Sequence, residues 1–453
     1  MSFNIQIVNE ISIKSQGNFS EKMLIEQVFI DSRIEVENGL FVPIVGERFD
    51  GHSFLETAIK QGAIASLWEE GKELPEGLDE NFPIFYVNST LKALEQLAKK
   101  YLRQVGPKVI GVTGSNGKTS TKDIIDAVLS TTFKTHKTAG NYNNHIGLPL
   151  TILAMPNDCE VAILEMGMNN FGEISFLSKI AEPDIAIITN IGESHIEQLG
   201  SRAGISKAKL EIIDGLREDG ILIIDGDEPL LKLNGNIKTV NCGYDDHNNF
   251  KIFDVNQTAD VTSFIINQQF QFTLRLLGKH NIKNSTYAIA AGKYLGLNEH
   301  TIQIGLDNCV LTGMRMEKVQ GQNGATIIND AYNSSPTSMK AAIETIKQLD
   351  GFNKRILVLG DMYELGKDEH ALHRSVATVI SKPITHLFTI GARGKWIAEA
   401  LLEHNNDKIE ISSYSTKEEL TEKLLPLLDN GSIVLIKASR GMKLETIAKN
   451  LYS

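Results

Sequence analysis

Cysteine is scarce in this sequence: only Cys159, Cys242 and Cys309 occur among 453 residues, and they are widely spaced. So few cysteines, in an odd number, exclude a small fold held by disulfide bonds and argue against a cysteine-rich metal site. Repeats of fixed period and low-complexity segments are also absent. With 42% hydrophobic and 22% charged residues, the composition is that of an ordinary globular protein from a reducing cytoplasm.

Long apolar segments are missing as well. The longest apolar runs, such as Val161–Leu164 and Ile185–Ile188, have the length of strands, whereas a membrane-spanning helix needs about 20 residues. The N-terminal segment MSFNIQIVNEISIKSQG has no basic stretch ahead of an apolar one, so we expect no signal peptide. These two absences predict a cytoplasmic protein with no membrane insertion.

Positively charged residues are in the minority: the chain has 45 lysines and arginines and 56 aspartates and glutamates, which gives a net charge of −11. A protein that binds nucleic acid through its phosphates needs an excess of cations, so we expect no nucleic-acid partner. A local basic site for a single phosphate group remains compatible with this balance.

The order of patterns along the chain predicts an α/β protein with three sections. Residues 1–105 contain short mixed patterns and a helical stretch, and the breaker pair Gly106-Pro107 follows. Residues 106–312 and 313–453 each alternate strand-length apolar runs with helical stretches, which favours mostly parallel sheets covered by helices. In the last section, Ser335 and Pro336 form the N-cap and first position of a predicted helix.

A glycine-rich turn lies between an apolar run and a helical stretch, in the segment KVIGVTGSNGKTSTKDII. Gly114 and Gly117 allow a tight turn whose N–H groups can point at phosphate oxygens. Lys118 would place a charge at the β- and γ-phosphates, and Thr119 would offer a hydroxyl to Mg²⁺. The first glycine of the usual phosphate-loop pattern is replaced by Val112, so Gly114 must make the turn. Nucleotide binding is therefore predicted.

The phosphate loop alone does not distinguish a ligase from a kinase, a GTPase switch or a transport ATPase. The chain contains no N-K-x-D guanine motif, which argues against a switch. Two strand-length runs end in groups that can bind a divalent ion: Glu165 follows VAIL, and His195 follows DIAIITNI within a few residues. Ligands bind at this edge of open α/β sheets, so both residues are candidate metal ligands.

The segment ISKAKLEIIDGL predicts a helix that carries Lys207 and Lys209. Residues two apart do not share a helix face, so at most one of the two can point into the site. An ammonium about 4 Å from Mg²⁺ would be repelled by roughly 8 kcal/mol at an effective dielectric near 20. A lysine there therefore needs an anionic substrate beside it, or conversion to a carbamate.

Several segments occur in the same order as in one known family. The chain resembles the Mur ligases of peptidoglycan synthesis from about Asp31 to the C-terminal SRGMKLE, in the segments TGSNGKTST, GNYNNHIGLP, LEMGMNNFGEI, TNIGESH, SKAKLE, GKHNIKN, TGMR, NDAYNSSPTSM and LGDMYELG. The resemblance implies three domains: a small α/β UDP-sugar domain over 1–105, a central P-loop ATPase-type parallel sheet over 106–312, and a C-terminal Rossmann-like domain over 313–453. It also implies an ADP-forming amide ligase that uses ATP, two Mg²⁺ ions and an acyl phosphate.

The resemblance also implies roles for individual residues. Lys118, Lys209, His195 and Glu165 would be catalytic, with Lys209 rather than Lys207 as the family's carbamylated lysine. Metal ligands would be Thr119, Glu165 and His195. The nucleotide would contact Gly114, Ser115, Asn116, Gly117, Lys118, Thr119 and Ser120, with Asn281 and Asn284 on the adenine side and Arg315 and Asp330 from the C-terminal domain. Substrate contacts would be Ser32 at the uridine nucleotide, Asn143, Asn144 and His145 in a substrate-side loop, and Asn333, Ser334, Asp361 and Glu364 near the incoming amine.

Within the family, the sequence favours the member that adds a dipeptide. The D-N-P-R signature of the ligase that adds the third peptide residue is absent, whereas NDAYNSSPTSM is present. The implied partners are UDP-N-acetylmuramoyl-tripeptide and D-alanyl-D-alanine, used by a monomer late in cytoplasmic precursor synthesis. Whether the third residue of the tripeptide is lysine or diaminopimelate stays open.

Three alternatives also stay open. Folylpolyglutamate synthetase shares the ATP chemistry, although it lacks a UDP-sugar domain and the 100 residues before the phosphate loop argue against it. A sibling Mur ligase would add a single amino acid. A nonenzymatic ATP-binding module would bind the nucleotide without ligation.

Overall fold

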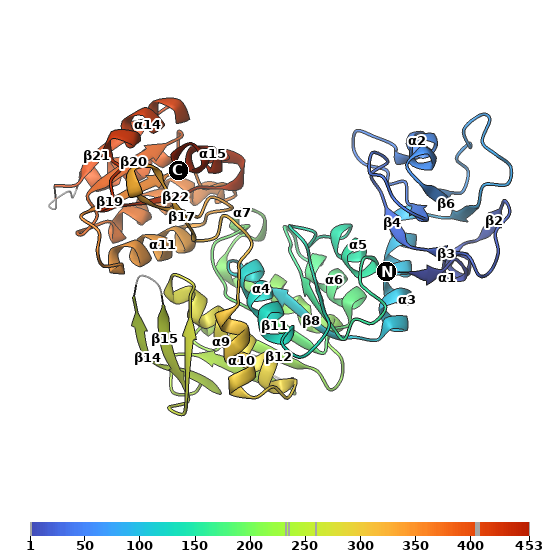
Figure 1. Cartoon of the computed structure of the whole chain (residues 1–453), viewed down its shortest axis with the longest axis horizontal. Coiled ribbons are helices and arrows are strands. Elements are labelled where there is room, and N and C mark those ends of the chain that lie inside the picture. Colours follow the sequence, from blue (N-terminus) through green and yellow to red (C-terminus); the bar gives the residue numbers. More distant parts are fainter. Residues whose placement is uncertain (1, 232, 234–235, 259–260, 404–407, 453) are drawn as a thin grey trace.

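The computed structural model describes residues 2–231, 233, 236–258, 261–403 and 408–452. Three units follow one another along the chain, each built on its own main sheet, and they lie in a row with the central unit in the middle (Figure 1). The fold is α/β throughout, which confirms the class expected from the sequence. None of the helices in the described ranges combines the length and the apolar character that a membrane crossing requires.

The N-terminal unit has a five-stranded sheet in the order β2-β7-β6-β5-β4, in which only β2 is antiparallel to its neighbour. A separate pair, β1 (Phe3–Asn4) and β3 (Leu24–Ile25), is antiparallel. The other elements are β2 (Lys14–Gln16), β4 (Gln27–Phe29), β5 (Gly39–Phe41), β6 (Ala63–Glu69), β7 (Ile84–Val87), α1 (Gln6–Ile11), α2 (Leu55–Lys60) and α3 (Thr90–Val105).

The central unit has a nine-stranded sheet in the order β16-β15-β14-β13-β12-β11-β8-β10-β9. Its strands are β8 (Lys108–Thr113), β9 (Thr135–Lys137), β10 (Val161–Glu165), β11 (Ile185–Ile188), β12 (Ile221–Asp225), β13 (Thr239–Gly243), β14 (Phe250–Gln257), β15 (Thr262–Ile266) and β16 (Phe270–Leu274). Its helices are α4 (Lys118–Leu129), α5 (Gly147–Leu153), α6 (Glu173–Ala181), α7 (Ile196–Leu199), α8 (Arg202–Leu210), α9 (Lys279–Tyr294) and α10 (Glu299–Asp307).

In the order of the sheet, the strands from β9 through β8 to β14 pair in parallel, as the alternating pattern predicts. Strands β14, β15 and β16 form an antiparallel extension that the sequence pattern did not indicate. The helix expected over ISKAKLEIIDGL is also divided. Helix α8 ends at Leu210, and a tighter 3₁₀ turn follows over Glu211–Gly215. Gly215 packs directly on the backbone of Ser178, where a β-carbon would lie 2.1 Å from the carbonyl oxygen, so this segment bends to follow α6.

The C-terminal unit has a six-stranded sheet in the order β17-β18-β22-β19-β20-β21, parallel except for β17. Its strands are β17 (Glu317–Gln320), β18 (Thr326–Asn329), β19 (Lys354–Leu359), β20 (His386–Ile390), β21 (Glu410–Tyr414) and β22 (Ser432–Lys437). Its helices are α11 (Pro336–Gln348), α12 (Glu369–Arg374), α13 (Gly394–Leu402), α14 (Lys417–Leu424) and α15 (Glu445–Leu451). Helix α11 begins at Pro336 with Ser335 as its N-cap in a capping box, as predicted.

Helix α3 joins the N-terminal unit to the central one (Figure 1). Its apolar side belongs to a continuous core that includes residues of both units, among them Leu94, Leu97 and Val109. Its polar atoms are also anchored to the central unit: Arg103 pairs with Glu182 at 2.6 Å, just after α6. The helix is therefore held in a set position against the central sheet.

Tyr101 provides a buried polar link at this junction, because its hydroxyl donates to the Met155 carbonyl at 2.6 Å. We expect Tyr101→Phe to lose about 0.5–1.5 kcal/mol of stability, since the ring stays in place but the hydrogen bond is lost. The matched control is Tyr294→Phe, whose hydroxyl lies on the surface 3.3 Å from the Asp219 carbonyl and should change stability by less than about 0.5 kcal/mol. Urea unfolding of both variants measures the difference; equal midpoints would contradict it.

Candidate active site

The glycine-rich turn between β8 and α4 has the backbone of a phosphate loop. Gly114 (φ +152°) and Gly117 (φ +80°) take up conformations that favour glycine. A β-carbon at Gly114 would lie 1.8 Å from Thr189 Oγ1, and one at Gly117 would lie 2.8 Å from Asn284 Oδ1. Both positions therefore require glycine for space as well as conformation, and Gly114 makes the turn although Val112 occupies the usual first glycine position.

The end of β11 holds this loop in place. The backbone N–H groups of Ser115 and Asn116 donate to Asn190, at 3.1 and 2.9 Å, and the Thr189 hydroxyl donates to the Asn116 carbonyl at 2.6 Å. Within the described residues, the buried atoms Ser115 Oγ and Asn116 Nδ2 have no hydrogen-bond partner. Buried polar atoms of this kind are rare in proteins, and these two fit a polar ligand on the loop.

Lys118 folds back over the loop, where its ammonium donates to the Gly114 carbonyl at 2.8 Å. Burial lowers the pKa of this amine. Lys118, Thr119 and Ser120 form the first turn of α4, whose N–H groups have no acceptor within the helix. The loop thus offers a cation and a helix N-terminus to an anion, which is the arrangement that binds phosphate groups.

Glu165 lies at the end of β10, next to the loop, and is almost fully buried. Its Oε2 accepts a hydrogen bond from the Thr119 hydroxyl at 2.7 Å, and its Oε1 accepts one from Asn143 Nδ2 at 2.8 Å. A carboxylate and a hydroxyl are oxygen ligands of the kind that Mg²⁺ prefers, so the two residues fit this ion together with nucleotide phosphates.

His195, the third predicted metal ligand, is the N-cap residue of α7 and has a positive φ of 64°. Its Nδ1 lies 2.7 Å from the carboxylate of Glu364 in the C-terminal unit, and this imidazole lowers the pKa of Glu364. The structure therefore brings Thr119 and Glu165 together and sets His195 against Glu364. No group of three or more His, Cys, Asp or Glu side chains with metal-binding spacing occurs in the described part of the chain.

The two lysines of α8 differ as the helix periodicity predicts. Lys209 is 1% exposed, and no hydrogen-bond acceptor among the described residues pairs with its amine. Burial lowers its pKa far below the usual value, and the nearby charge of Lys118 lowers it further. Lys207 is exposed, with its ammonium 5.9 Å from the centre of the Phe171 ring. Only Lys209 points inward, so a buried amine whose depressed pKa favours the uncharged form lies beside the phosphate loop.

The C-terminal unit contributes cations to the same region. The Arg315 guanidinium donates to the Thr119 hydroxyl at 3.0 Å and lies 3.9 Å from the centre of the Tyr332 ring. Asp330 accepts from the Lys437 ammonium at 2.6 Å, and that ammonium also donates to the Asn333 carbonyl at 3.0 Å. Sequence reasoning missed Lys437. The available signal was a lysine at the end of the apolar run SIVLIK.

Direct contacts join the C-terminal unit to the phosphate loop and its neighbours. The Ser335 hydroxyl donates to Asn116 Oδ1 at 3.2 Å, and the Thr337 hydroxyl donates to the Glu193 carboxylate at 2.7 Å. Ser334 Oγ is buried without a partner in the described ranges. The N-terminus of α11 therefore contacts the loop. Sequence reasoning missed Glu193, although this residue lies in the segment TNIGESH.

The remaining predicted residues fall into two groups: some make hydrogen bonds within the protein, and others lie away from the phosphate loop. Asn281 and Asn284 are buried on α9, where Asn284 donates to Asn281 at 3.0 Å behind Gly117. Asp361 accepts from the N–H groups of Arg393 and Gly394 at the start of α13, so one of its oxygens caps that helix. Ser32 lies after β4 in the N-terminal unit, on a different sheet from the loop.

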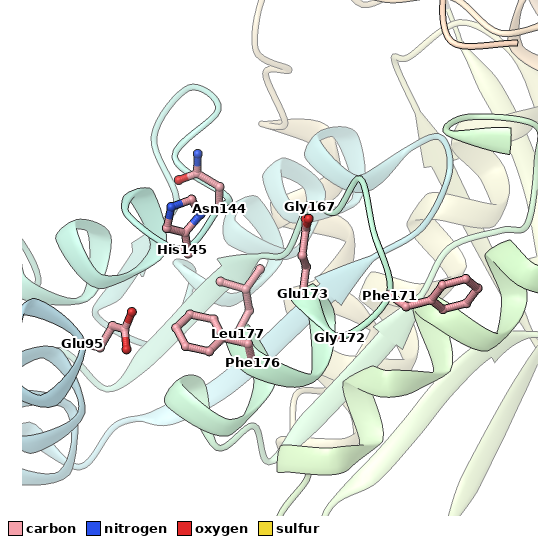
Figure 2. Close-up of a pocket in the computed structure, with 9 residues that line it drawn as sticks. All are labelled: Glu95, Asn144, His145, Gly167, Phe171, Gly172, Glu173, Phe176 and Leu177. Carbon is pink, nitrogen blue, oxygen red and sulfur yellow. The ribbon is translucent and has the colours of Figure 1, made fainter. Parts of the chain in front are cut away.

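Two pockets border the region. Asn144 and His145 line one of about 350 Å³ between α3, α5 and α6, where Asn144 Oδ1 also accepts from the Gly147 N–H at 2.8 Å (Figure 2). Glu364 lines the other, of about 680 Å³, together with Glu197 of α7 and Arg393. The site therefore opens toward the N-terminal unit on one side and toward the C-terminal unit on the other.

Three family descriptions match successive parts of the chain: the Mur ligase family catalytic domain over residues 24–102, the Mur ligase middle domain over 112–292, and the Mur ligase glutamate ligase domain over 314–440. The UDP-N-acetylmuramoyl-tripeptide–D-alanyl-D-alanine ligase of Bacillus subtilis is 50% identical over 433 residues, which cover 95% of this chain and 94% of that protein. The ligase of the same name from Escherichia coli is 32% identical, over 94% of each chain.

Solved structures give the same result. The chain is similar to MurF from Acinetobacter baumannii with a TM-score of 0.87 and 26% identity, over 100% of this chain and 99% of that one. It is similar to the MurF ligase of Thermotoga maritima in complex with ADP with a TM-score of 0.83 and 28% identity, over 94% and 96% of the two chains. A folylpolyglutamate synthase from Mycobacterium tuberculosis shares the fold, with a TM-score of 0.63 and 16% identity over 79% of this chain.

A parallel sheet with a glycine-rich loop at its carboxyl edge, covered there by a second α/β unit, defines a P-loop nucleotide-binding protein. The chain belongs to the Mur ligase family.

The unpaired amine of Lys209 leads to a prediction about stability. We expect Lys209→Met to raise the free energy of unfolding by about 0.5–2 kcal/mol in bicarbonate-free buffer, because methionine fills the space without a buried polar group. The folded pKa of Lys209 lies below its unfolded value, so the cost of burying the amine is full at low pH and declines as the pH rises toward about 10.4. The gain from methionine should decline in parallel.

Chemical unfolding of wild type and variant at several pH values measures this gain. The matched control is Lys207→Met, on the exposed side of the same helix, which should change stability by less than about 0.5 kcal/mol. A Lys209→Met protein that is less stable than wild type across the pH range would contradict an unpaired amine.

Proposed function

We propose that this chain is an ATP-dependent, ADP-forming ligase that joins D-alanyl-D-alanine to the peptide carboxylate of UDP-N-acetylmuramoyl-tripeptide, in the synthesis of peptidoglycan precursors. The observation that carries the proposal is the phosphate loop with Thr119 and Glu165 hydrogen-bonded at its edge and Lys209 buried beside it. The 50% identity to the Bacillus subtilis ligase over 95% of the chain supports the same substrates.

The nucleotide would bind with its phosphates on the loop residues Gly114 to Ser120. Lys118 would leave the Gly114 carbonyl and contact the β- and γ-phosphates, and Arg315 would approach the γ-phosphate from the C-terminal unit. Asn281 and Asn284 would support the loop from the adenine side, and Asp330 would orient Lys437. Two Mg²⁺ ions are proposed, and Thr119, Glu165 and His195 are the residues that would hold them. When bound, Mg²⁺ offsets the charge of the triphosphate.

The proposed reaction has two steps. An oxygen of the terminal carboxylate of the tripeptide attacks the γ-phosphorus of ATP, and the bond between the γ-phosphorus and the β-phosphate oxygen breaks. ADP departs, and the tripeptide now carries an acyl phosphate. The amine nitrogen of D-alanyl-D-alanine then attacks the acyl carbon, loses a proton and displaces phosphate. Chemistry of this kind depends on position and on charge neutralisation, which the cations Lys118 and Arg315 supply.

Closure of the C-terminal unit would complete the site. We propose that the chain divides functionally at 1–105 for the UDP substrate, 106–312 for ATP and 313–453 for closure over both. Ser32 would contact the uridine nucleotide, and Asn143, Asn144 and His145 would guide the peptide toward Glu165. Asn333, Ser334, Asp361 and Glu364 would surround the incoming amine. The contacts of Ser335 with Asn116 and of His195 with Glu364 support an arrangement in which open forms are inactive.

We also propose that Lys209 carries a carbamate. Burial depresses the pKa of its amine, which favours the uncharged form, and an uncharged amine can attack CO₂ to give a carbamate and one released proton. The resulting anion would lie beside the ammonium of Lys118 and pair with its charge. It would also offer Mg²⁺ an anionic group in place of an amine.

An assay of ADP release tests the proposed function. We expect wild-type protein to release ADP from ATP only when UDP-N-acetylmuramoyl-tripeptide and D-alanyl-D-alanine are both present. Lys118→Ala should lose at least about 100-fold in rate. Its unfolding curve should stay close to that of wild type, because the contacts with Asn190 and Thr189 still hold the loop. Release that is independent of both acceptors would favour a nonenzymatic or unrelated ATPase. Release with a single amino acid, or with a folate, would favour a sibling ligase or a folylpolyglutamate synthetase.

Chemical rescue tests the carbamate. Lys209→Ala should lose most of the ligase activity and regain part of it with short carboxylic acids such as acetate, which can replace the missing anion. Lys207→Ala is the matched control and should be active without rescue, because its side chain lies outside the site. Full activity of Lys209→Ala without added acid would reject the carbamate, as would a loss that no carboxylic acid restores.

A further inference from the structure

The pocket between α3, α5 and α6 has one open carboxylate at the end of an apolar wall. We propose that it holds the side chain of the third peptide residue, and that Glu95 binds the terminal ammonium of that side chain. This inference rests on the proposed function and adds a substrate class: an alkyl chain with an ammonium group at its far end, where lysine carries the ammonium alone and diaminopimelate carries a carboxylate on the same carbon.

The shape of the pocket fits such a chain. It measures about 350 Å³, and Phe176 and Leu177 of α6 form its wall. Glu95 of α3 lies at one end and Gly167 lies toward the other, with the aromatic and aliphatic side chains between them (Figure 2). An extended aliphatic chain could lie against this wall with its polar end at Glu95.

The opposite end of the pocket leads to the reaction centre. The Gly167 N–H donates to the Asn143 carbonyl at 2.8 Å, and Asn143 Nδ2 donates to Glu165 Oε1 at 2.8 Å. Glu165 in turn accepts from Thr119 of the phosphate loop. Three hydrogen bonds in series therefore connect the pocket wall with the phosphate loop, where the γ-phosphate is proposed to lie.

The proposed chemistry places the third residue at this position. The carboxylate that receives the phosphoryl group is the α-carboxylate of the last residue of the tripeptide, and that residue is the third. Its side chain branches from the carbon next to the reacting group, so it must lie within one side-chain length of the loop. The pocket lined by Gly167 adjoins the Asn143–Glu165 pair, whereas the pocket lined by Glu364 faces the C-terminal unit.

Glu95 is the one lining carboxylate that has no partner among the described residues. The other, Glu173, accepts from the Asn169 N–H at 2.9 Å and from the Asn170 amide at 3.0 Å. Partial burial raises the pKa of Glu95, and the charge of Lys92 offsets only part of this effect. A ligand ammonium would remove the cost of this half-buried anion, because it supplies the missing opposite charge.

The position of Glu95 relative to the reaction centre is well defined. Helix α3 is fixed to the central unit by the Lys99 ammonium, which donates to the Lys179 carbonyl at 2.8 Å, and by the ion pair of Arg103 with Glu182. Glu95 lies on this anchored helix, so its distance from the loop does not depend on how the rest of the N-terminal unit moves. A carboxylate in a fixed position can select substrate side chains by their length.

Steady-state kinetics with three substrates test the proposal: UDP-N-acetylmuramoyl-tripeptides that end in lysine, diaminopimelate or norleucine, which has the alkyl chain without the ammonium. We expect wild type to show at least a tenfold higher kcat/KM with lysine or diaminopimelate than with norleucine, chiefly through KM. Glu95→Gln should lose this preference by raising KM for the ammonium substrates. The preferred substrate of wild type then identifies which of the two side chains the pocket takes.

The matched control is Glu10→Gln, which removes an exposed carboxylate of the adjacent helix α1 that pairs with Lys100. It should retain the wild-type preference. Equal kcat/KM for all three substrates in wild type, or an unchanged preference in Glu95→Gln, would overturn the ammonium site while leaving ligase activity intact. No ADP release by wild type with any of the three would instead contradict the proposed function.

Discussion

The parallel pairing of β8 with β10 and β11 is the constraint on which the site depends. In this register Glu165 lies opposite Val112 and Ile188 lies opposite Thr113, so three strands end at one edge of the sheet. The phosphate loop, the Glu165 carboxylate and the segment that holds the loop all leave from that edge. Because parallel strands share their direction, groups far apart in sequence meet within hydrogen-bonding distance, as Thr119 and Glu165 do across a separation of 46 residues.

The same edge explains why one chain needs three units. A carboxylate and a triphosphate repel one another, so the loop must be surrounded by cations from several directions. Lys118 comes from the loop itself, whereas Arg315 comes from the C-terminal unit and contacts Thr119 across the boundary. Helix α3 brings the N-terminal unit to the opposite side. We expect the buried amine of Lys209, which has no partner among the described residues, to lower stability, which is a common property of groups retained for function.

Motifs that are local in sequence were predictable. The loop, the strand-end Glu165 and the separation of Lys207 from Lys209 all follow from spacing, because strand and helix periods determine which side chains share a face. The antiparallel strands β14 to β16 were not predicted, since short mixed patterns do not specify a partner. The break after α8 was not predicted either, because it arises from the contact of Gly215 with the Ser178 backbone. Lys437 and Glu193 depend on distant neighbours in the same way.

By itself, the sequence determined the α/β class, the nucleotide-binding turn and the membership of a family of ligases, because these depend on patterns within a few dozen residues. Only the tertiary structure decided which polar groups pair. It placed His195 against Glu364, used one oxygen of Asp361 to cap a helix, and left Glu95 in a pocket beside the proposed reaction centre, without a partner among the described residues. Pairing of this kind depends on distances between segments that lie far apart in the sequence, and spacing along a chain carries no information about them.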